Sequence, residues 1–258
     1  MNRFVLGLIA VGAWFSSTVA CAQADKPTVV LVHGAFAESS SWNGVIEVLQ
    51  KDGYSVVAAA NPLRSVKGDA QYVANVVSSI KSPVVLVGHS YGGMVISQAA
   101  VGNANVKALV FVGAFAPEAG ESAAGLSGKF PGSTLGPTLA PPVSLSNGGK
   151  DLYIQQEKFH SQFAADVTDG DAKLMAATQR PITEAALNEA ATAPAWKNVP
   201  AWFVYGDKDK NIPPQALAFM ADRAHSKQTV VVKGASHVVM VSNPEAVAKL
   251  IERAATAK

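Results

Sequence analysis

The sequence has a single cysteine and few charged residues. One cysteine among 258 residues allows neither a disulfide framework nor a cysteine-based zinc site. Lys and Arg (21) nearly balance Asp and Glu (19), and there is no basic run of the kind that binds nucleic acid. The motifs GxxxxGKS/T, HExxH and GxGxxG are also missing. We therefore expect no nucleic-acid partner, no metal and no organic cofactor.

The chain has enough apolar residues to form a large core. Hydrophobic residues make up 49% of the sequence, which is too many for a disordered chain. The length suits one α/β domain, or one such domain with an insertion.

The first 24 residues have the features of a signal peptide. A positively charged start is followed by an apolar run over residues 4–15, which is too short to be a preferred membrane span. Small residues then provide a cleavage site after Ala24, so that the mature chain covers residues 25–258. We therefore expect export to the periplasm or the medium. A lipid anchor on Cys21 is the minor alternative, because Thr18 stands where a bacterial lipobox has a large aliphatic residue.

Beyond this leader, apolar runs rich in β-branched residues alternate with helical patterns. The predicted strands cover residues 28–33, 54–60, 83–87, 106–112, 199–205 and 228–232. The predicted helices cover residues 42–51, 69–81, 91–101, 214–224 and 244–255. Unbroken apolar runs are typical of parallel strands that are buried on both faces. The alternation predicts an α/β fold, in which helices cover both faces of a mostly parallel sheet.

The alternation stops between Gly113 and Asn198, a stretch too long for a plain loop in a compact domain. Its first part, residues 117–149, is rich in Gly, Pro and Ser, and we expect little helix there. Its second part has helical patterns at residues 155–163, 171–178 and 183–191. We interpret residues 117–198 as a cap inserted into the sheet domain.

The strongest chemical signal is the run Gly88-His89-Ser90-Tyr91-Gly92, which matches GxSxG. On its own this pattern arises by chance, but here a predicted strand runs into it and a predicted helix follows. A nucleophile elbow needs that arrangement, because the tight turn presents the serine hydroxyl above the sheet. The alternative is a tight turn with an incidental serine. The context favours Ser90 as a nucleophile.

A serine hydroxyl needs a base beside it at neutral pH. His237 follows the last predicted strand on a loop at the carboxyl edge of the sheet, where Ser90 also lies. The other four histidines fit this role less well, because we expect them to shape a turn, to point away from the serine or to lie in helices. They are His33, His89, His160 and His225.

The third residue of such a triad is an acid that orients the histidine. The predicted strand over residues 199–205 is followed by two candidates, Asp207 and Asp209. Asp207 is close enough to the strand end to cap the turn, so we choose Asp209. The order Ser90, Asp209, His237 is that of the α/β-hydrolases.

Two backbone N–H groups are expected to form an oxyanion hole. One belongs to Tyr91, the residue after the nucleophile. The other lies in the loop after the first strand, where Ala35 is the first candidate and Phe36 the second. Large residues, mostly in the cap, are candidates to line the substrate pocket, although apolar residues at helical spacing are more often core. The pocket candidates are Phe36, Phe159, His160, Phe163, Met175 and Trp196.

Further motifs extend beyond the triad. Residues 29–42 read VVLVHGAFAESSSW, Phe159 is followed by His160, and the segment from His237 to Pro244 reads His-x-x-Met-x-x-x-Pro. With the GHSYGG elbow, these motifs resemble those of an α/β-hydrolase, and within that fold those of the plant methylesterase and hydroxynitrile lyase group. The resemblance covers most of the mature chain and implies the α/β-hydrolase fold with an inserted cap.

The same resemblance bears on the reaction. The lyases of this group have Thr where this chain has Gly34, and a Lys directly after the catalytic histidine, where this chain has Val238. That lysine stabilises the leaving cyanide, so its absence implies an esterase. We expect a serine carboxylesterase whose partner is a small-molecule ester, either apolar or aromatic.

Two other kinds of function share this sequence pattern. A hydrolase-fold protein could bind a ligand with little turnover. A triad enzyme could also use another acceptor, as a perhydrolase, a C–C bond hydrolase or a lyase does. The complete triad pattern favours catalysis over binding alone.

Overall fold

The computed structural model describes residues 26–257. The predicted signal peptide, residues 1–24, and Cys21 lie outside this part of the chain. Within it, no helix combines the length and the apolar character that a membrane span requires.

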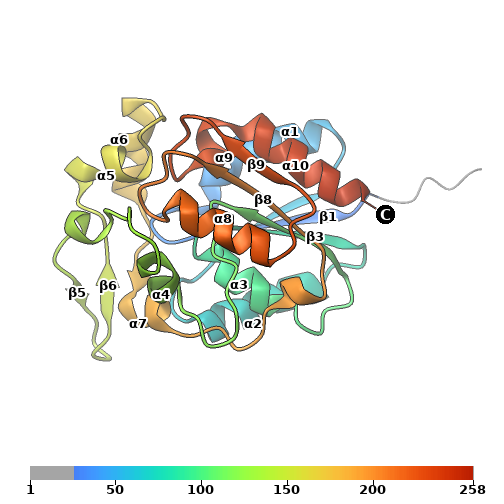
Figure 1. Ribbon diagram of the computed structural model, residues 1–258, viewed down its shortest axis with the longest axis horizontal. Helices are drawn as coiled ribbons and strands as arrows, with labels where there is room; N and C mark the ends of the chain where they lie inside the picture. The colour runs from blue at the N-terminus through green and yellow to red at the C-terminus, as the bar shows by residue number, and fades with distance from the viewer. Residues whose placement is uncertain (1–25, 258) are drawn as a thin grey trace, which may run out of the picture.

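Six parallel strands form the central sheet (Figure 1). They are β1 (Thr28–Val32), β2 (Val56–Ala59), β3 (Val84–His89), β4 (Val106–Val112), β8 (Ala201–Gly206) and β9 (Thr229–Val232). The strand order is β2-β1-β3-β4-β8-β9, and each neighbouring pair is parallel. The predicted parallel sheet is confirmed, and the strand ends differ from the predicted ones by at most two residues.

Burial on both faces holds for the centre of the sheet but not for its edges. Every residue of β1, β3 and β8 is buried. The edge strand β9 instead alternates between exposed and half-buried residues, and Val231 is 51% exposed. The expectation of two buried faces was therefore wrong for this strand, because it has a neighbour on one side only.

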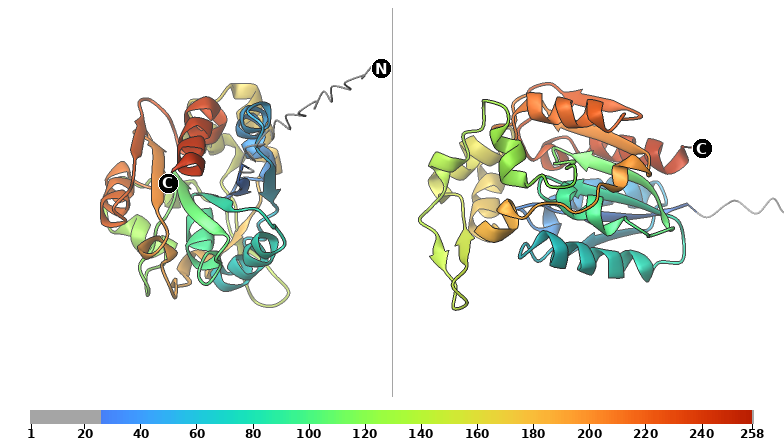
Figure 2. Two further views of the ribbon diagram at one scale, coloured as in Figure 1. Left: turned by 90° about the vertical axis from the view of Figure 1, so that its right-hand side faces the viewer. Right: turned by 60° about the horizontal axis from the view of Figure 1, so that its bottom comes forward.

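Helices cover both faces of the sheet (Figure 2). On one face α1 (Asn43–Lys51) packs against α10 (Pro244–Thr256), with the short α9 (Val239–Ser242) beside them. On the other face α2 (Val66–Ser78) packs against α3 (Gly92–Ala99), and α8 (Pro214–Arg223) packs on β8. A 3-10 turn, η1 (Ser39–Trp42), leads into α1. The five helices predicted outside the cap are all present.

The chain between β4 and β8 forms a cap at one end of the sheet (Figure 2). Its helices are α4 (Ala123–Gly128), α5 (Gln156–Phe163), α6 (Asp169–Thr178) and α7 (Glu184–Asn188), with the 3-10 turns η2 (Gly136–Thr138) and η3 (Ala195–Lys197). The strands β5 (Val143–Ser144), β6 (Lys150–Leu152) and β7 (Ile182–Thr183) form a small antiparallel sheet. The sequence predicted α5, α6 and α7, but neither this sheet nor α4. Helix α4 forms in a Gly- and Ser-rich segment because the Ser122 hydroxyl accepts the Gly125 N–H and caps its first turn.

We expect Gly93→Ala to destabilise the fold strongly. A β-carbon at Gly93, in the first turn of α3, would lie 2.1 Å from the carbonyl oxygen of Phe115. Relieving that clash should cost at least about 3 kcal/mol of unfolding free energy, measured by urea denaturation. Gly170→Ala is the matched control, because Gly170 occupies the same place in α6 and its β-carbon would have no contact closer than 4.0 Å. The control should be neutral or stabilising, by up to about 1 kcal/mol. Equal effects of the two substitutions would contradict the packing argument.

Candidate active site

Ser90 lies in the tight turn between β3 and α3, and its backbone is in the left-handed region with a φ of 53°. Three backbone hydrogen bonds hold it there. Its N–H donates to the Val112 carbonyl (3.3 Å), and its carbonyl accepts the N–H groups of Gly93 (2.9 Å) and Phe115 (3.2 Å). A non-glycine residue in this conformation costs about 1–3 kcal/mol, and the surrounding backbone maintains it. This is the geometry of a nucleophile elbow.

His237 and Asp209 form a buried hydrogen-bonded pair. The His237 Nδ1 lies 2.6 Å from Asp209 Oδ2, and both side chains are at most 1% exposed. The other carboxylate oxygen, Oδ1, accepts the backbone N–H groups of Asn211 (2.8 Å) and Ile212 (3.0 Å). Because a carboxylate only accepts, Nδ1 is the protonated nitrogen of the ring. The lone pair of the neutral ring is therefore on Nε2.

Asp207 has a different place. Its Oδ1 accepts the N–H of Gly234 at 2.6 Å, which ties the end of β8 to the turn after β9. Asp207 thus caps a turn, and Asp209 is the aspartate that the structure brings to His237.

Ser90 and His237 both lie next to the Val112–Gly113 segment, at the carboxyl end of β4. Val112, which accepts the Ser90 N–H, precedes Gly113, and a β-carbon at Gly113 would lie 3.3 Å from the His237 carbonyl oxygen. The His237 Nε2 is buried and has no hydrogen-bond partner among residues 26–257. This nitrogen is therefore available to accept the proton of a serine hydroxyl.

The ring of His89 lies against that of His237. The ring centroids of His89 and His237 are 4.8 Å apart, and the His89 Nε2 lies 3.1 Å from the His237 carbonyl oxygen. Burial, with the nearby His237, lowers the pKa of His89 well below its ordinary value, so its ring is neutral. Since a carbonyl only accepts, Nε2 donates, and His89 supports the backbone of His237.

Two of the three candidate oxyanion donors are free. The N–H groups of Ala35 and Tyr91 make no hydrogen bond within the described chain, and both residues line the cavity beside Ser90. The N–H of Phe36 instead donates to the Arg180 carbonyl at 2.9 Å. Phe36, our second choice, is therefore not available as a donor.

The side chain of Tyr91 is anchored away from the cavity. Its hydroxyl donates to the buried Asp69 Oδ2 at 3.0 Å, and Asp69 Oδ1 accepts the backbone N–H of Arg64 at 3.2 Å. Burial raises the pKa of Asp69, although both hydrogen bonds oppose this shift. The anchor therefore fixes a residue that lines the cavity and has an unpaired backbone N–H among the described residues.

The cavity beside Ser90 is small and mostly apolar. Its volume is about 330 Å³, and no charged side chain lines it. The sheet domain contributes the two candidate oxyanion residues, together with Phe36, Phe115 and Ile212. The cap contributes α4 and the loop after it, with Leu135, Leu139 and Leu187. A ligand in this cavity must be largely apolar and uncharged.

Residues 29–250 match the family described as "Alpha/beta hydrolase family". The chain belongs to the alpha/beta hydrolase family. The match covers both the sheet and the cap, as the sequence resemblance predicted.

Individual relatives have two kinds of named activity. This hydrolase is 26% identical to the "Alpha/beta hydrolase nvfD" of Aspergillus novofumigatus (strain IBT 16806), over 89% of this chain and 97% of that protein. It is also 26% identical to the "Alpha-hydroxynitrile lyase" of Arabidopsis thaliana, over 85% of this chain and 93% of the lyase. Among solved structures, polyneuridine aldehyde esterase is similar with a TM-score of 0.77 at 19% identity, over 89% of this chain and 99% of that one. The predicted resemblance to the plant methylesterase and hydroxynitrile lyase group is confirmed.

Several predicted pocket residues do not reach this cavity. Phe159 and Phe163 are fully buried in α5, where Phe163 packs edge-on against His237 with 5.1 Å between ring centroids. His160 stays within the cap, with Nε2 2.9 Å from the Val167 carbonyl and Nδ1 2.9 Å from Asp169. Like these three, Met175 is not among the lining residues.

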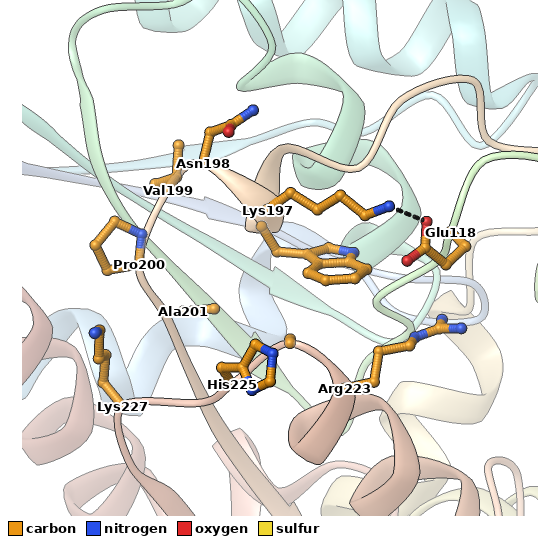
Figure 3. Close-up of a pocket in the computed structure, with 11 residues that line it drawn as sticks. Glu118, Lys197, Asn198, Val199, Pro200, Ala201, Arg223, His225 and Lys227 are labelled. Carbon is orange, nitrogen blue, oxygen red and sulfur yellow. Dashed lines mark ion pairs between the residues drawn. The ribbon is translucent and has the colours of Figure 1, made fainter.

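Trp196 lines a different cavity, of about 520 Å³, which Ser90 does not border. Figure 3 shows this second cavity, where Lys197 pairs with Glu118 at 2.7 Å. The Trp196 indole N–H donates to the Pro117 carbonyl at 2.8 Å. Trp196 therefore anchors the base of the cap and does not shape the pocket beside Ser90.

The sequence analysis missed the polar residues that fasten the cap to the Asp209 loop. The Gln162 Nε2 donates to the Asn211 Oδ1 at 2.7 Å. The hydroxyls of Ser127 and Ser133 both donate to the Asn211 carbonyl, at 3.1 and 2.9 Å. The available signal was that Asn211 stands two residues after the predicted acid.

The described residues show no cluster of His, Cys, Asp and Glu that could hold a metal ion.

Proposed function

We propose that this alpha/beta hydrolase is a serine carboxylesterase for small apolar or aromatic esters. The observation that carries the proposal is the buried Asp209–His237 pair at 2.6 Å, at the sheet edge where Ser90 stands in a left-handed elbow. Two free backbone N–H groups and an uncharged cavity complete the set of groups that ester hydrolysis needs.

In the proposed reaction Ser90 is the nucleophile and His237 the base. The Ser90 Oγ attacks the ester carbonyl carbon while the His237 Nε2 takes its proton. Asp209 holds the ring in the productive tautomer and stabilises its positive charge. The imidazolium then protonates the leaving alcohol, and an acyl-enzyme remains. Water, activated by the same Nε2, releases the acid and restores the serine.

Negative charge develops on the carbonyl oxygen during both steps. The N–H groups of Ala35 and Tyr91 are the donors that we assign to it, because both residues line the cavity and neither N–H has an acceptor within residues 26–257. Such a donor typically contributes about 3 kcal/mol of transition-state stabilisation.

Two residues next to Ser90 and His237 favour hydrolysis over cyanide elimination, although one relative is named as a lyase. A β-carbon at Gly34, where the lyases have Thr, would lie 2.6 Å from Ser90 Cβ and 2.7 Å from the His89 carbonyl oxygen. This backbone therefore leaves no room for a threonine. Val238, where the lyases have Lys, is fully buried and offers no cation to a leaving anion.

We expect Ser90→Ala to abolish ester hydrolysis while the protein remains folded. Loss of a triad nucleophile costs several orders of magnitude in rate, because no other group in the cavity replaces it. The measurement is hydrolysis of p-nitrophenyl butyrate, with thermal unfolding as the control for folding. A fluorophosphonate probe should label Ser90 in the wild type and nothing in the variant. Activity within tenfold of wild type, or a labelled serine elsewhere, would show that the nucleophile is wrong. A folded wild type that neither hydrolyses the ester nor reacts with the probe would instead leave a ligand-binding role.

The two neighbouring aspartates provide a matched pair of variants. Asp209→Asn should lower kcat by roughly 10⁴-fold, because the amide cannot hold His237 in the productive tautomer. Asp207→Asn should retain most activity, since an amide oxygen can still accept the Gly234 N–H. Steady-state kinetics on both variants decide between them. A larger loss in Asp207→Asn would mean that the acid is assigned to the wrong residue.

The size of the cavity predicts a preference for short acyl chains. A volume of about 330 Å³ is at the small end for ligand pockets, and the cap helix α4 forms part of its wall. We expect p-nitrophenyl acetate and butyrate to be hydrolysed faster than octanoate, and octanoate faster than palmitate, when kcat/KM is compared. Faster cleavage of palmitate than of butyrate would indicate a lipase with a mobile lid.

A further inference from the structure

The loop that carries the Ala35 amide is held from two sides. On the inner side, Gly34 lies so close to the elbow that a β-carbon there would be 2.6 Å from Ser90 Cβ. On the outer side, Phe36 has a φ of 61° and donates its N–H to the Arg180 carbonyl at 2.9 Å. A phenylalanine does not adopt this left-handed conformation without external support. The Ala35–Phe36 peptide is therefore held by the backbone carbonyl of residue 180, so its orientation depends on where the Arg180 backbone lies.

The side chain of Arg180 makes a second contact with the same loop. Its Nη2 donates to Glu38 Oε2 at 3.0 Å, and its Nε lies 3.0 Å from Glu38 Oε1. The guanidinium is thus close to both carboxylate oxygens, although only Nη2 makes a hydrogen bond with one of them. Both side chains are about a third exposed, so the ion pair contributes little to global stability. Its effect is on the position of the loop.

Arg180 itself is fixed by the cap. The preceding residue, Gln179, is buried, and its side chain accepts the Ile154 N–H (2.8 Å) and donates to the Ile154 carbonyl (2.9 Å). The carbonyl of the following residue, Pro181, accepts a hydrogen bond from Arg64 Nη2 at 2.6 Å. A continuous chain of contacts therefore leads from the cap interior through Arg180 to the amide beside Ser90.

We propose that Arg180 is a positioning residue for the oxyanion hole: it holds the Ala35–Phe36 peptide from the cap, so that a seated cap is a condition for transition-state stabilisation. The inference rests on the proposed function, because it assigns the Ala35 N–H to the developing oxyanion. Arg180 touches neither the nucleophile nor the cavity, and it acts only through the loop.

The test compares Arg180→Gln with Arg223→Gln. The first substitution removes the contact with Glu38 and keeps the backbone bond to Phe36, so it tests whether the guanidinium keeps that carbonyl in register with the loop. Arg223 also pairs with two carboxylate oxygens, those of Glu121 at 3.0 and 2.6 Å, and so joins the cap to α8 without contacting the oxyanion loop. We expect Arg180→Gln to lower kcat for p-nitrophenyl butyrate roughly tenfold, with KM within about twofold, since small misplacements of a donor reduce the rate and not ground-state binding. Arg223→Gln should leave kcat unchanged.

A second measurement is the inhibition constant of a trifluoromethyl ketone with a short alkyl chain. A loss of protein stability alone would not change this constant. The Ser90 oxygen adds to its carbonyl carbon, the carbonyl electron pair becomes an oxyanion, and the serine proton passes to His237. Arg180→Gln should raise the inhibition constant by the same factor as it lowers kcat/KM, while Arg223→Gln should leave it unchanged. Equal kinetics in the two variants, or a fall in kcat/KM without weaker ketone binding, would overturn the proposal.

The double variant Arg180→Gln/Glu38→Gln separates positioning from charge. If Arg180 acts by holding the loop, the double variant should be as slow as Arg180→Gln alone. Recovery of activity would mean that Arg180 only neutralises Glu38, which contradicts a positioning role. A wild-type protein that neither hydrolyses the ester nor binds the ketone would instead contradict the proposed function, whereas active wild type with unaffected Arg180→Gln contradicts this inference alone.

Discussion

The left-handed backbone of Ser90 is the constraint around which the site is arranged. It is supported by the segment at the end of β4, where the carbonyl of Val112 and the N–H of Phe115 both bond to Ser90. The loop after β1 also lies directly on the elbow. A β-carbon at Gly34 would clash with Ser90, so this position requires a glycine. The parallel sheet makes this possible, since the carboxyl ends of its strands meet at one edge. Strain at one residue is thus maintained by the order of the whole sheet.

Buried and part-buried polar contacts join the cap to the loop that carries Asp209. Asn211 follows Asp209, the proposed acid, by two residues, and its carbonyl and side chain receive hydrogen bonds from Ser127, Ser133 and Gln162 in the cap. Phe163 of the same cap packs on His237. Cap residues therefore contact the supports of both the acid and the base. A cap of this kind contributes to the alignment of the catalytic groups as well as to the exclusion of water.

The sheet could be predicted from the sequence because its signals are local. In β3, residues 84–87 are an unbroken apolar run, and the elbow that follows has a fixed spacing. The cap could not be predicted to the same depth. The composition of residues 117–149 argued against helix, yet the Ser122 cap and packing on α7 produce α4 there. The aromatic pattern of α5 could be read from the sequence. Periodicity does not show whether Phe159 contacts a ligand or the core, and in the structure it is buried in the core.

The uncharged wall of the cavity beside Ser90 has a consequence for the end of the catalytic cycle. The proposed reaction turns a neutral ester into an acid that ionises at neutral pH. Burying a carboxylate without a cation or several donors is strongly unfavourable, and the lining offers no cation. The acid is therefore a poorer ligand than the ester from which it came. Product departure is favoured by the same surface that admits the substrate, and accumulating acid competes only weakly with fresh ester.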